Sequence, residues 1–184
     1  MNVEQNKTSF VLIVTGGIAA YKSATLTSRL VQAGHRVRVV MTPSAEKFIG
    51  RATFRALTGQ SVVTDLYDPA FTLGAHIELA RDYDQVVVAP ATANFLAKAA
   101  NGIADDLAST LYLCFTGTVT VAPAMNVEMW NHAAVQRNVA QLRADRVKLV
   151  DPQEGWLSCR TKGVGRMAEP ESILETITAP TDES

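Results

Sequence analysis

Two side chains of this sequence are suited to act on a substrate: His76 and Asn126. An imidazole transfers protons near neutral pH, and an amide can bind a carboxylate without a fixed charge. Each residue also has a purely structural interpretation. His76 fits a surface or capping histidine, and Asn126 fits the N-cap of a helix. The residues around each side chain must show whether the functional or the structural interpretation applies.

Small and hydroxyl-bearing residues follow the apolar runs and are suited to bind a phosphate. Gly16 and Gly17 come directly after the run 10–15 and open a helix, whose free N–H groups suit an anion. Because T-G-G-I-A lacks the G-x-G-x-x-G spacing, a mononucleotide phosphate fits better than a dinucleotide pyrophosphate. Thr42 and Ser44 could add hydroxyl donors. The alternative interpretation of the two glycines is a tight turn between a strand and a helix.

Apolar runs of strand length alternate with helix-like segments, as in a parallel sheet covered on both faces. The expected strands are 10–15, 36–41, 85–89, 119–122 and 147–150. The expected helices are 18–33, 43–48, 53–57, 91–102, 105–113, 131–143 and 171–177. This order predicts an α/β fold, a single domain over 1–184 with a doubly wound parallel sheet. Ligands of such sheets bind beyond the carboxyl ends of the strands.

The segment 151–170 has no regular periodicity and is rich in glycine, proline and charge. A loop of that length inside a compact domain is usually functional or disordered, so we interpret it as a lid. Residues 179–184 are expected to fray.

Composition and charge exclude several classes of protein. Of the 184 residues, 47% are hydrophobic and 19% are charged, which is a globular composition, and the net charge of -1 predicts no binding of nucleic acid or anionic membrane. Two cysteines are too few for a disulfide framework, and their spacing does not resemble a zinc site, so no metal is expected. Cys114, in an apolar helix, is interpreted as a buried free thiol. The polar start and the lack of a long apolar run predict a soluble, cytoplasmic protein.

Six motifs occur in order along the chain: T-G-G-I-A-A-Y-K (15–22), G-A-H-I-E-L-A (74–80), A-P-A-T-A-N (89–94), G-I-A-D-D-L (102–107), A-P-A-M-N-V-E-M-W (122–130) and C-R-T-K-G-V-G-R-M (159–167). Together they closely resemble the homo-oligomeric flavin-containing cysteine decarboxylases. That family includes phosphopantothenoylcysteine decarboxylase of coenzyme A synthesis and enzymes that decarboxylate carboxy-terminal cysteines of peptides. The resemblance implies a Rossmann-like flavoprotein that binds FMN and forms trimers or multiples such as dodecamers.

The resemblance also implies roles for individual residues. Catalytic roles fall on His76, Asn126 and Cys159, with Asn126 gripping the substrate carboxylate. The implied FMN contacts are Gly16, Gly17, Ile18, Ala19, Thr42, Ser44, Phe48, Ala91, Thr92, Asn94 and Met125. The implied substrate contacts are Asn126, Met129, Cys159, Arg160, Arg166 and Met167, and the segment 155–167 maps onto the family's substrate clamp. On spacing alone, Met125, Met129 and Trp130 fit core packing instead. Since the family binds flavin at subunit interfaces, His76 is expected to act on a flavin bound mainly by a neighbour.

The implied reaction begins with oxidation of the Cα–Cβ–S unit of a cysteine to a thioaldehyde. Loss of carbon dioxide then gives an ene-thiolate, and FMN is the electron acceptor that side chains cannot supply. In the coenzyme A enzyme the ene-thiol is reduced again to 4'-phosphopantetheine, with the clamp cysteine as proton source. Cys159 favours this outcome over a peptide decarboxylase, whose product stays an ene-thiol.

Two features favour the peptide decarboxylase instead. The coenzyme A enzymes typically have glycine where Arg160 stands. Many bacterial versions also carry a fused ligase domain, for which this sequence shows no counterpart. Because an arginine adopts positive φ only at a cost, the clamp is expected to bend differently here or to contact a different substrate. A third hypothesis, a flavin-binding regulatory subunit without turnover, needs none of His76, Asn126 and Cys159.

Overall fold

The structure is a computed structural model that describes residues 7–179. Its main sheet has five parallel strands in the order β2-β1-β3-β4-β5. The strands are β1 (Ser9–Val14), β2 (Arg36–Met41), β3 (Gln85–Ala91), β4 (Thr118–Pro123) and β5 (Lys148–Leu149). All six residues of β1 are buried, as expected of a parallel strand with both faces covered. The predicted doubly wound α/β fold is confirmed.

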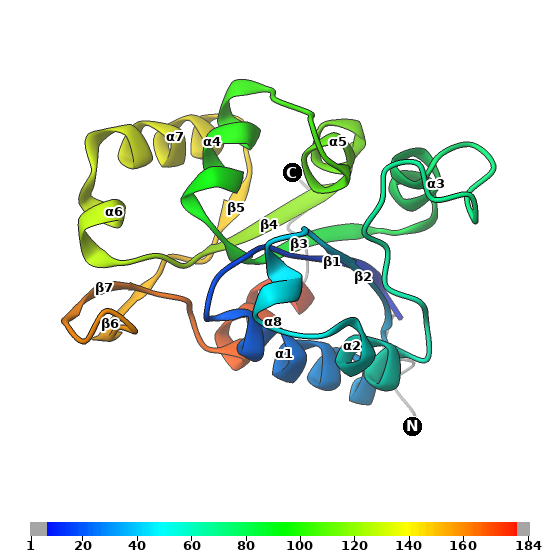
Figure 1. The fold of residues 1–184 in the computed structure, drawn as a ribbon, viewed down its shortest axis with the longest axis horizontal. Coiled ribbons are helices and arrows are strands. Elements are labelled where there is room, and N and C mark those ends of the chain that lie inside the picture. The colour runs from blue at the N-terminus through cyan, green and yellow to red at the C-terminus, as the bar shows by residue number, and fades with distance from the viewer. Residues whose placement is uncertain (1–6, 180–184) are drawn as a thin grey trace.

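Helices cover both faces of this sheet (Figure 1). One layer contains α1 (Ala20–Gln32), α2 (Arg51–Thr58) and α8 (Pro170–Thr178). The other layer contains α3 (Ala75–Asp82), α4 (Ala93–Asn101), α5 (Leu107–Cys114) and α7 (Ala133–Ala144). Alternate residues of β1 enter the two cores, since Leu12 packs in the first layer and Ile13 in the second. None of the helices in 7–179 is long and apolar enough to span a bilayer.

Three expectations need correction or qualification. The helix predicted at 131–143 is α7, which begins only at Ala133, and the short helix before it, α6 (Val127–Asn131), was not predicted. The two are separate because His132 adopts extended backbone and its Nδ1 accepts from the N–H of Ala134. The predicted burial of Cys114 is wrong: its thiol is exposed. Most of the predicted frayed tail, 180–184, lies outside the described residues.

The segment 151–170 is more regular than predicted. It contains β6 (Gln153–Trp156) and β7 (Lys162–Arg166), which pair antiparallel in a sheet of their own. We call residues 153–166 the hairpin. The expectation of an irregular loop is therefore wrong, although the segment does stand apart from the main sheet (Figure 1).

Candidate functional site

The sheet has its topological switch point at β1, because the chain continues to β2 on one side and to β3 on the other. The loops after β1 and β3 diverge there, which opens a crevice beyond the carboxyl ends of both strands. Thr15 fastens the two loops together. Its Oγ1 donates to the carbonyl of Pro90 at 2.7 Å and accepts from the N–H of Thr92 at 3.0 Å. Thr92 in turn caps α4, so this edge of the sheet is rigid before any ligand binds.

A cavity of about 390 Å³ lies between the start of α1, the β4–α6 loop and the hairpin. We call it the clamp cavity. Many of the predicted cofactor and substrate contacts line it: Gly16, Gly17, Ile18, Ala19, Thr92, Met125, Asn126, Met129, Arg166 and Met167. The structure thus brings together residues from positions 16 to 167 of the chain, as the resemblance implies.

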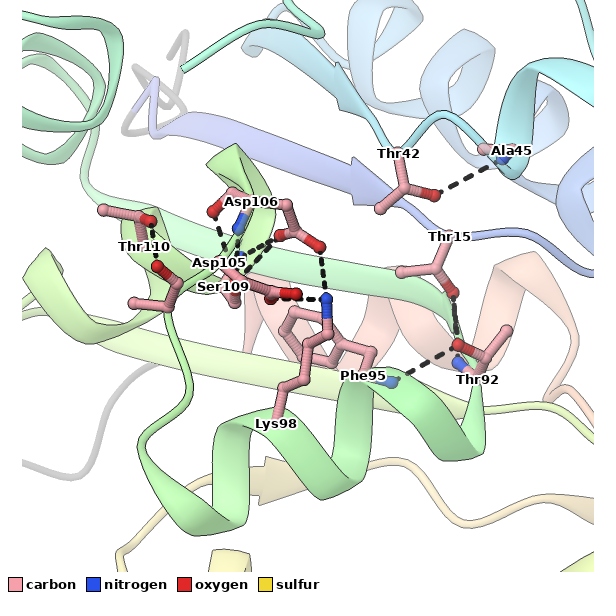
Figure 2. Close-up of polar contacts among 11 residues, drawn as sticks. Thr15, Thr42, Ala45, Thr92, Phe95, Lys98, Asp105, Asp106, Ser109 and Thr110 are labelled. Atoms are coloured by element: carbon pink, nitrogen blue, oxygen red, sulfur yellow. Dashed lines mark hydrogen bonds and ion pairs between the residues drawn. The ribbon is translucent and has the colours of Figure 1, made fainter.

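A second cavity of about 410 Å³ also has Gly16 in its lining, and we call it the hydroxyl cavity. Its lining includes the predicted residues Thr42, Ser44 and Asn94. The two cavities share Gly16, Thr92, Ala93 and Met129. Figure 2 shows the hydroxyl-bearing side chains of Thr15, Thr42 and Thr92 on this side of the sheet edge.

Gly16 allows two loops to approach each other closely at this edge. A Cβ at Gly16 would lie 2.3 Å from Cβ of Ser44, whereas a Cβ at Gly17 would find its nearest neighbour, Cγ2 of Thr92, at 3.8 Å. The close approach of the two loops therefore requires a glycine at position 16, independently of any ligand. The second glycine lies in the lining of the clamp cavity without such a clash, and its own N–H donates to the carbonyl of Thr15 at 3.1 Å. Its lack of a side chain lets a phosphate approach the start of the helix closely.

The only charges in the lining of the hydroxyl cavity belong to Lys98 and Asp106. Nζ of Lys98 lies 2.5 Å from the carboxylate of Asp105 and 2.8 Å from that of Asp106 (Figure 2). Burial raises the pKa of Asp106, but hydrogen bonds from Lys98 and Ser109 outweigh it, so the pKa lies below its usual value. Because the lysine is neutralised by its partners, hydroxyl and amide groups remain to bind a polar ligand here.

Asn126 combines the two interpretations drawn from the sequence. Its Oδ1 accepts from the N–H of Met129 at 2.8 Å and so caps α6. That bond fixes the orientation of the amide, and no residue within 7–179 accepts a hydrogen bond from its Nδ2. Asn126 lines the clamp cavity, where its free donors suit a carboxylate.

The hairpin is attached to the β4–α6 loop through glycine. The carbonyl of Gly165 accepts from the N–H of Met125 at 3.0 Å, and a Cβ at Gly165 would lie 2.3 Å from the Met125 carbonyl oxygen. A Cβ at Gly163 would lie 2.9 Å from Cβ of Val127. Side chains at either position would push the hairpin away, so the glycines determine how closely it covers the cavity.

The hairpin tip is a tight turn that ends in a left-handed residue. The N–H of Arg160 donates to the carbonyl of Leu157, that of Leu157 donates to the carbonyl of Thr161, and Arg160 has a φ of 64°. Glycine is preferred at that position of such loops. The expectation that arginine would avoid this bend is therefore wrong. Sγ of Cys159 lies 3.0 Å from Oγ1 of Thr161 at the exposed tip.

Several predicted site residues do not line either cavity. Cys159 and Arg160 are exposed at the hairpin tip, Phe48 is half-exposed, and Ala91 is buried at the end of β3. His76 lies on α3, at the opposite end of the molecule from α6 (Figure 1). Its Nδ1 is buried and has no partner within the part of the chain that the structure describes.

Sequence reasoning also missed residues of the clamp cavity. Tyr21, Lys22 and Trp156 line it, and the Lys22 side chain is only 7% exposed. Lys22 follows the Gly16–Gly17 loop by one helical turn in the T-G-G-I-A-A-Y-K motif. Its place in that motif was the signal that could have indicated a role.

Comparison with known proteins agrees with the motifs. A family model described as Flavoprotein matches residues 1–181. The coenzyme A biosynthesis bifunctional protein CoaBC of Bacillus subtilis is 47% identical over 171 residues, 92% of this chain. The chain spans 42% of the length of that relative.

Two solved structures share the fold along nearly their whole length. The FMN-dependent cysteine decarboxylase SpaF has 35% sequence identity and a TM-score of 0.82, covering 93% of this chain and 95% of its own. A mutant PPC decarboxylase complexed with pantothenoylaminoethenethiol has 30% identity and a TM-score of 0.85, covering 94% and 97%. The resemblance identified from the six motifs is confirmed.

Proposed function

Because the chain belongs to the flavoprotein family, we propose that it is an FMN-dependent decarboxylase of a cysteine-derived carboxylate. The favoured substrate is 4'-phosphopantothenoylcysteine, and the product is 4'-phosphopantetheine. The observation that carries the proposal is the free Nδ2 of Asn126 in the clamp cavity, across from the Gly16–Gly17 loop. The similarity to CoaBC and to a PPC decarboxylase supports this substrate.

The proposed FMN site consists of the sheet edge with its two cavities. Gly16 and Gly17 would hold the phosphate, Thr42, Ser44 and Asn94 would add polar contacts, and Met125 would pack on the ring. FMN supplies a two-electron acceptor and, at the end of the reaction, a two-electron donor.

The chain's own residues bind, orient and protonate the substrate. Asn126 donates to the carboxylate that is lost, and as an uncharged group it does not hold that anion too tightly before reaction. Once the Cα–Cβ–S unit is oxidised to a thioaldehyde, the electron pair released with carbon dioxide moves into it and yields an ene-thiolate. The hairpin would exclude water, and Cys159 would supply a proton when the ene-thiol is reduced. Two electrons leave the substrate and two return, so carbon dioxide is the only net loss.

The proposal includes a homo-oligomer, a trimer or a multiple of one, in which a second copy brings His76 to the site. Within one chain His76 lies far from Asn126, and its buried Nδ1 is unpartnered among residues 7–179. Tyr67, which is 85% exposed, and Leu73 lie in the loop before His76, and burial against a neighbour would remove this apolar surface from water.

The first experiment is mass spectrometry of products formed without oxygen. The purified yellow protein is incubated with 4'-phosphopantothenoylcysteine and, separately, with a peptide that ends in cysteine. Loss of carbon dioxide alone from the first substrate over many turnovers is the expected result. No turnover of either substrate by FMN-loaded protein would overturn the proposal and leave the regulatory subunit as the remaining hypothesis.

Mixing two inactive variants tests the contribution of a second copy. We expect His76→Asn and Asn126→Asp each to bind FMN but to lose decarboxylation, and a mixture reassembled from both to regain part of it. Asp still caps α6, so the second variant removes the amide donors without removing the cap. If the mixture stays inactive although mixed oligomers form, His76 and Asn126 do not act across an interface.

A second candidate function is oxidative decarboxylation of a peptide's carboxy-terminal cysteine. Arg160 at the hairpin tip favours it, and SpaF, a cysteine decarboxylase, supports it. This function predicts loss of carbon dioxide plus two hydrogens from the peptide, with one turnover per flavin until air is admitted.

A further inference from the structure

Lys22 is a buried cation that the proposed reaction does not use. Its Nζ donates to the carbonyl of Met167 at 3.0 Å and to Oε1 of Glu169 at 3.0 Å. Met167 is fully buried, and the Lys22 side chain is 7% exposed. A buried lysine is costly unless it is paired and hydrogen-bonded, so these contacts are needed to keep it there.

The contacts of Lys22 join two parts of the clamp cavity. Lys22 lies in the first turns of α1, directly after the Gly16–Gly17 loop, and Met167 and Glu169 are where the chain leaves the hairpin. Glu169 Oε1 also forms an ion pair with Nη2 of Arg166 at 2.8 Å. One carboxylate therefore holds a cation from α1 and a cation from the last residue of β7.

Arg166 extends this connection to the base of the hairpin. It pairs with Gln153 across the two strands, and both it and Lys22 line the clamp cavity. The hairpin's other attachment, Gly165 to Met125, lies on the β4–α6 loop. The hairpin root is thus held from two sides, by the Asn126 loop and by the helix that follows the glycine loop.

From this arrangement we propose that Lys22 is a positioning residue, which locks the root of the hairpin to α1 and so sets the distance between the hairpin and the glycine loop. Lys22 acts through Met167 and Glu169, without a chemical step of its own. The effect of Lys22 on turnover rests on the proposed function. The effect of Lys22 on the hairpin does not depend on that function.

The decisive variant is Lys22→Met, which keeps the length and apolar packing of the side chain and removes the ammonium. Limited proteolysis with trypsin reports on the hairpin directly, because Arg160 and Lys162 are exposed at its tip. We expect cleavage there to become about tenfold faster, since a locally loosened segment is cut in proportion to its open population. FMN content should stay as in the parent protein.

Arg29→Met is the matched control. Arg29 lies on the same helix and pairs with Glu171 of α8 at 3.7 Å, but both side chains are more than half exposed. Such a surface pair contributes little, so the cleavage rate should not change. Equal rates in the Lys22 and Arg29 variants would overturn the proposal.

Kinetics separate positioning from a general loss of structure. With 4'-phosphopantothenoylcysteine, Lys22→Met should raise KM about tenfold and leave the rate of flavin bleaching at saturating substrate within about twofold. A variant with reduced FMN content and an unchanged hairpin would show that Lys22 contacts the cofactor, and the proposal would be wrong.

Glu169→Gln keeps the inference testable if Lys22→Met does not fold. The amide oxygen can still accept from Lys22, and the Met167 contact remains, so the hairpin should loosen by a smaller factor than in Lys22→Met. The double variant should be loosened by less than the product of the two single effects, because both changes act on one network. If the parent protein fails to decarboxylate either substrate, the proposed function fails, while the proteolysis result still decides the role of Lys22.

Discussion

The clamp cavity has two walls that are built in opposite ways: the sheet edge, which we call the rigid wall, and the hairpin. On the sheet edge, a fully buried strand leads into loops that Thr15 fastens by hydrogen bonds to Pro90 and Thr92. The hairpin consists of two short strands in which every residue but Gly165 is exposed or half-buried, and Trp156 is 68% exposed. An isolated two-stranded hairpin is marginally stable, so this wall depends on its attachments.

This difference suits the sheet edge to binding the cofactor and the hairpin to closing the cavity. A cofactor that stays bound through every turnover is best served by a preformed site, which the sheet edge provides. A cover that admits substrate and releases product must come from the less stable part of a structure. We therefore expect changes in the sheet edge to affect FMN binding and stability, and changes in the hairpin to affect the later steps of the reaction.

Gly16→Ala should have the largest effect, because it damages the rigid wall. Its Cβ would lie 2.3 Å from Cβ of Ser44 and 2.8 Å from the Ser44 backbone carbon, so the loops must separate. We expect loss of bound FMN and destabilisation by about 1–3 kcal/mol. Flavin absorbance per protein and thermal unfolding measure the two effects. Gly17→Ala is the control for stability, as its Cβ has room, and equal destabilisation by both variants would contradict the steric argument.

Cys159→Ser alters the hairpin tip and should leave the rigid wall intact. FMN should stay bound and bleach at the normal rate when substrate is added without oxygen. The product should then stall at the ene-thiol, because the proposed proton source is missing. Mass spectrometry distinguishes the ene-thiol from the reduced product by two hydrogens. Fully reduced product formed at the parent rate would show that Cys159 has no part in the second half of the reaction.

The rigid wall was also the part that could be predicted from the sequence. Its strands are continuous apolar runs such as Val86–Val88, and Gly16–Gly17 follows such a run directly. The hairpin carries few signals of this kind, because Gly155, Gly163 and Gly165 serve close packing and weaken the strand pattern. Its partners lie at Met125 and Lys22, distant in the chain, so only the folded structure shows why the glycines are there.

The burial of individual side chains and the grouping of site residues were harder to predict than the strands. Cys114 lies in an apolar stretch, yet it and Leu113 lie on the side of α5 that faces away from the core. The roles proposed for His76 and Asn126 came from the resemblance, because no spacing in one chain could indicate that residues on distant elements such as α3 and α6 act together. Lys22 was missed because a lysine in a helix normally indicates a solvated surface.

Asp106→Asn tests the electrostatics of the hydroxyl cavity and should have a moderate effect that depends on pH. Since the pKa of Asp106 is below its usual value of 3.8 in the folded protein, its ionised form adds stability above that pH. That stability is lost as the pH falls through the folded pKa. Asparagine can still cap α5, so the variant should be less stable than the parent at neutral pH and converge with it in acid.

Denaturant unfolding across the acid range measures the convergence. Asp105→Asn is the control, because its side chain is 61% exposed and should contribute less. A difference between parent and Asp106→Asn that does not change with pH would show that the ion pair is not its cause.

Arg160→Gly should have the smallest effect, confined to the hairpin tip. Glycine adopts a φ of 64° without strain, so the turn should gain about 1 kcal/mol of local stability. Amide exchange of 158–161 should slow, while FMN binding and the unfolding temperature stay the same. Faster exchange would mean that the arginine side chain stabilises the tip. If the variant also prefers the pantothenoyl substrate over the peptide more strongly, Arg160 contributes to substrate choice.

The hairpin's base has a consequence for how such chains can vary in length. Gln153 pairs with Arg166, so the chain leaves the domain and returns to it at neighbouring positions. Residues added or removed at the tip would change how far the hairpin reaches without moving β5 or α8, and lengthening a surface loop costs little entropy. The hairpin is geometrically an insertion. Its length can change while the rest of the domain stays as it is.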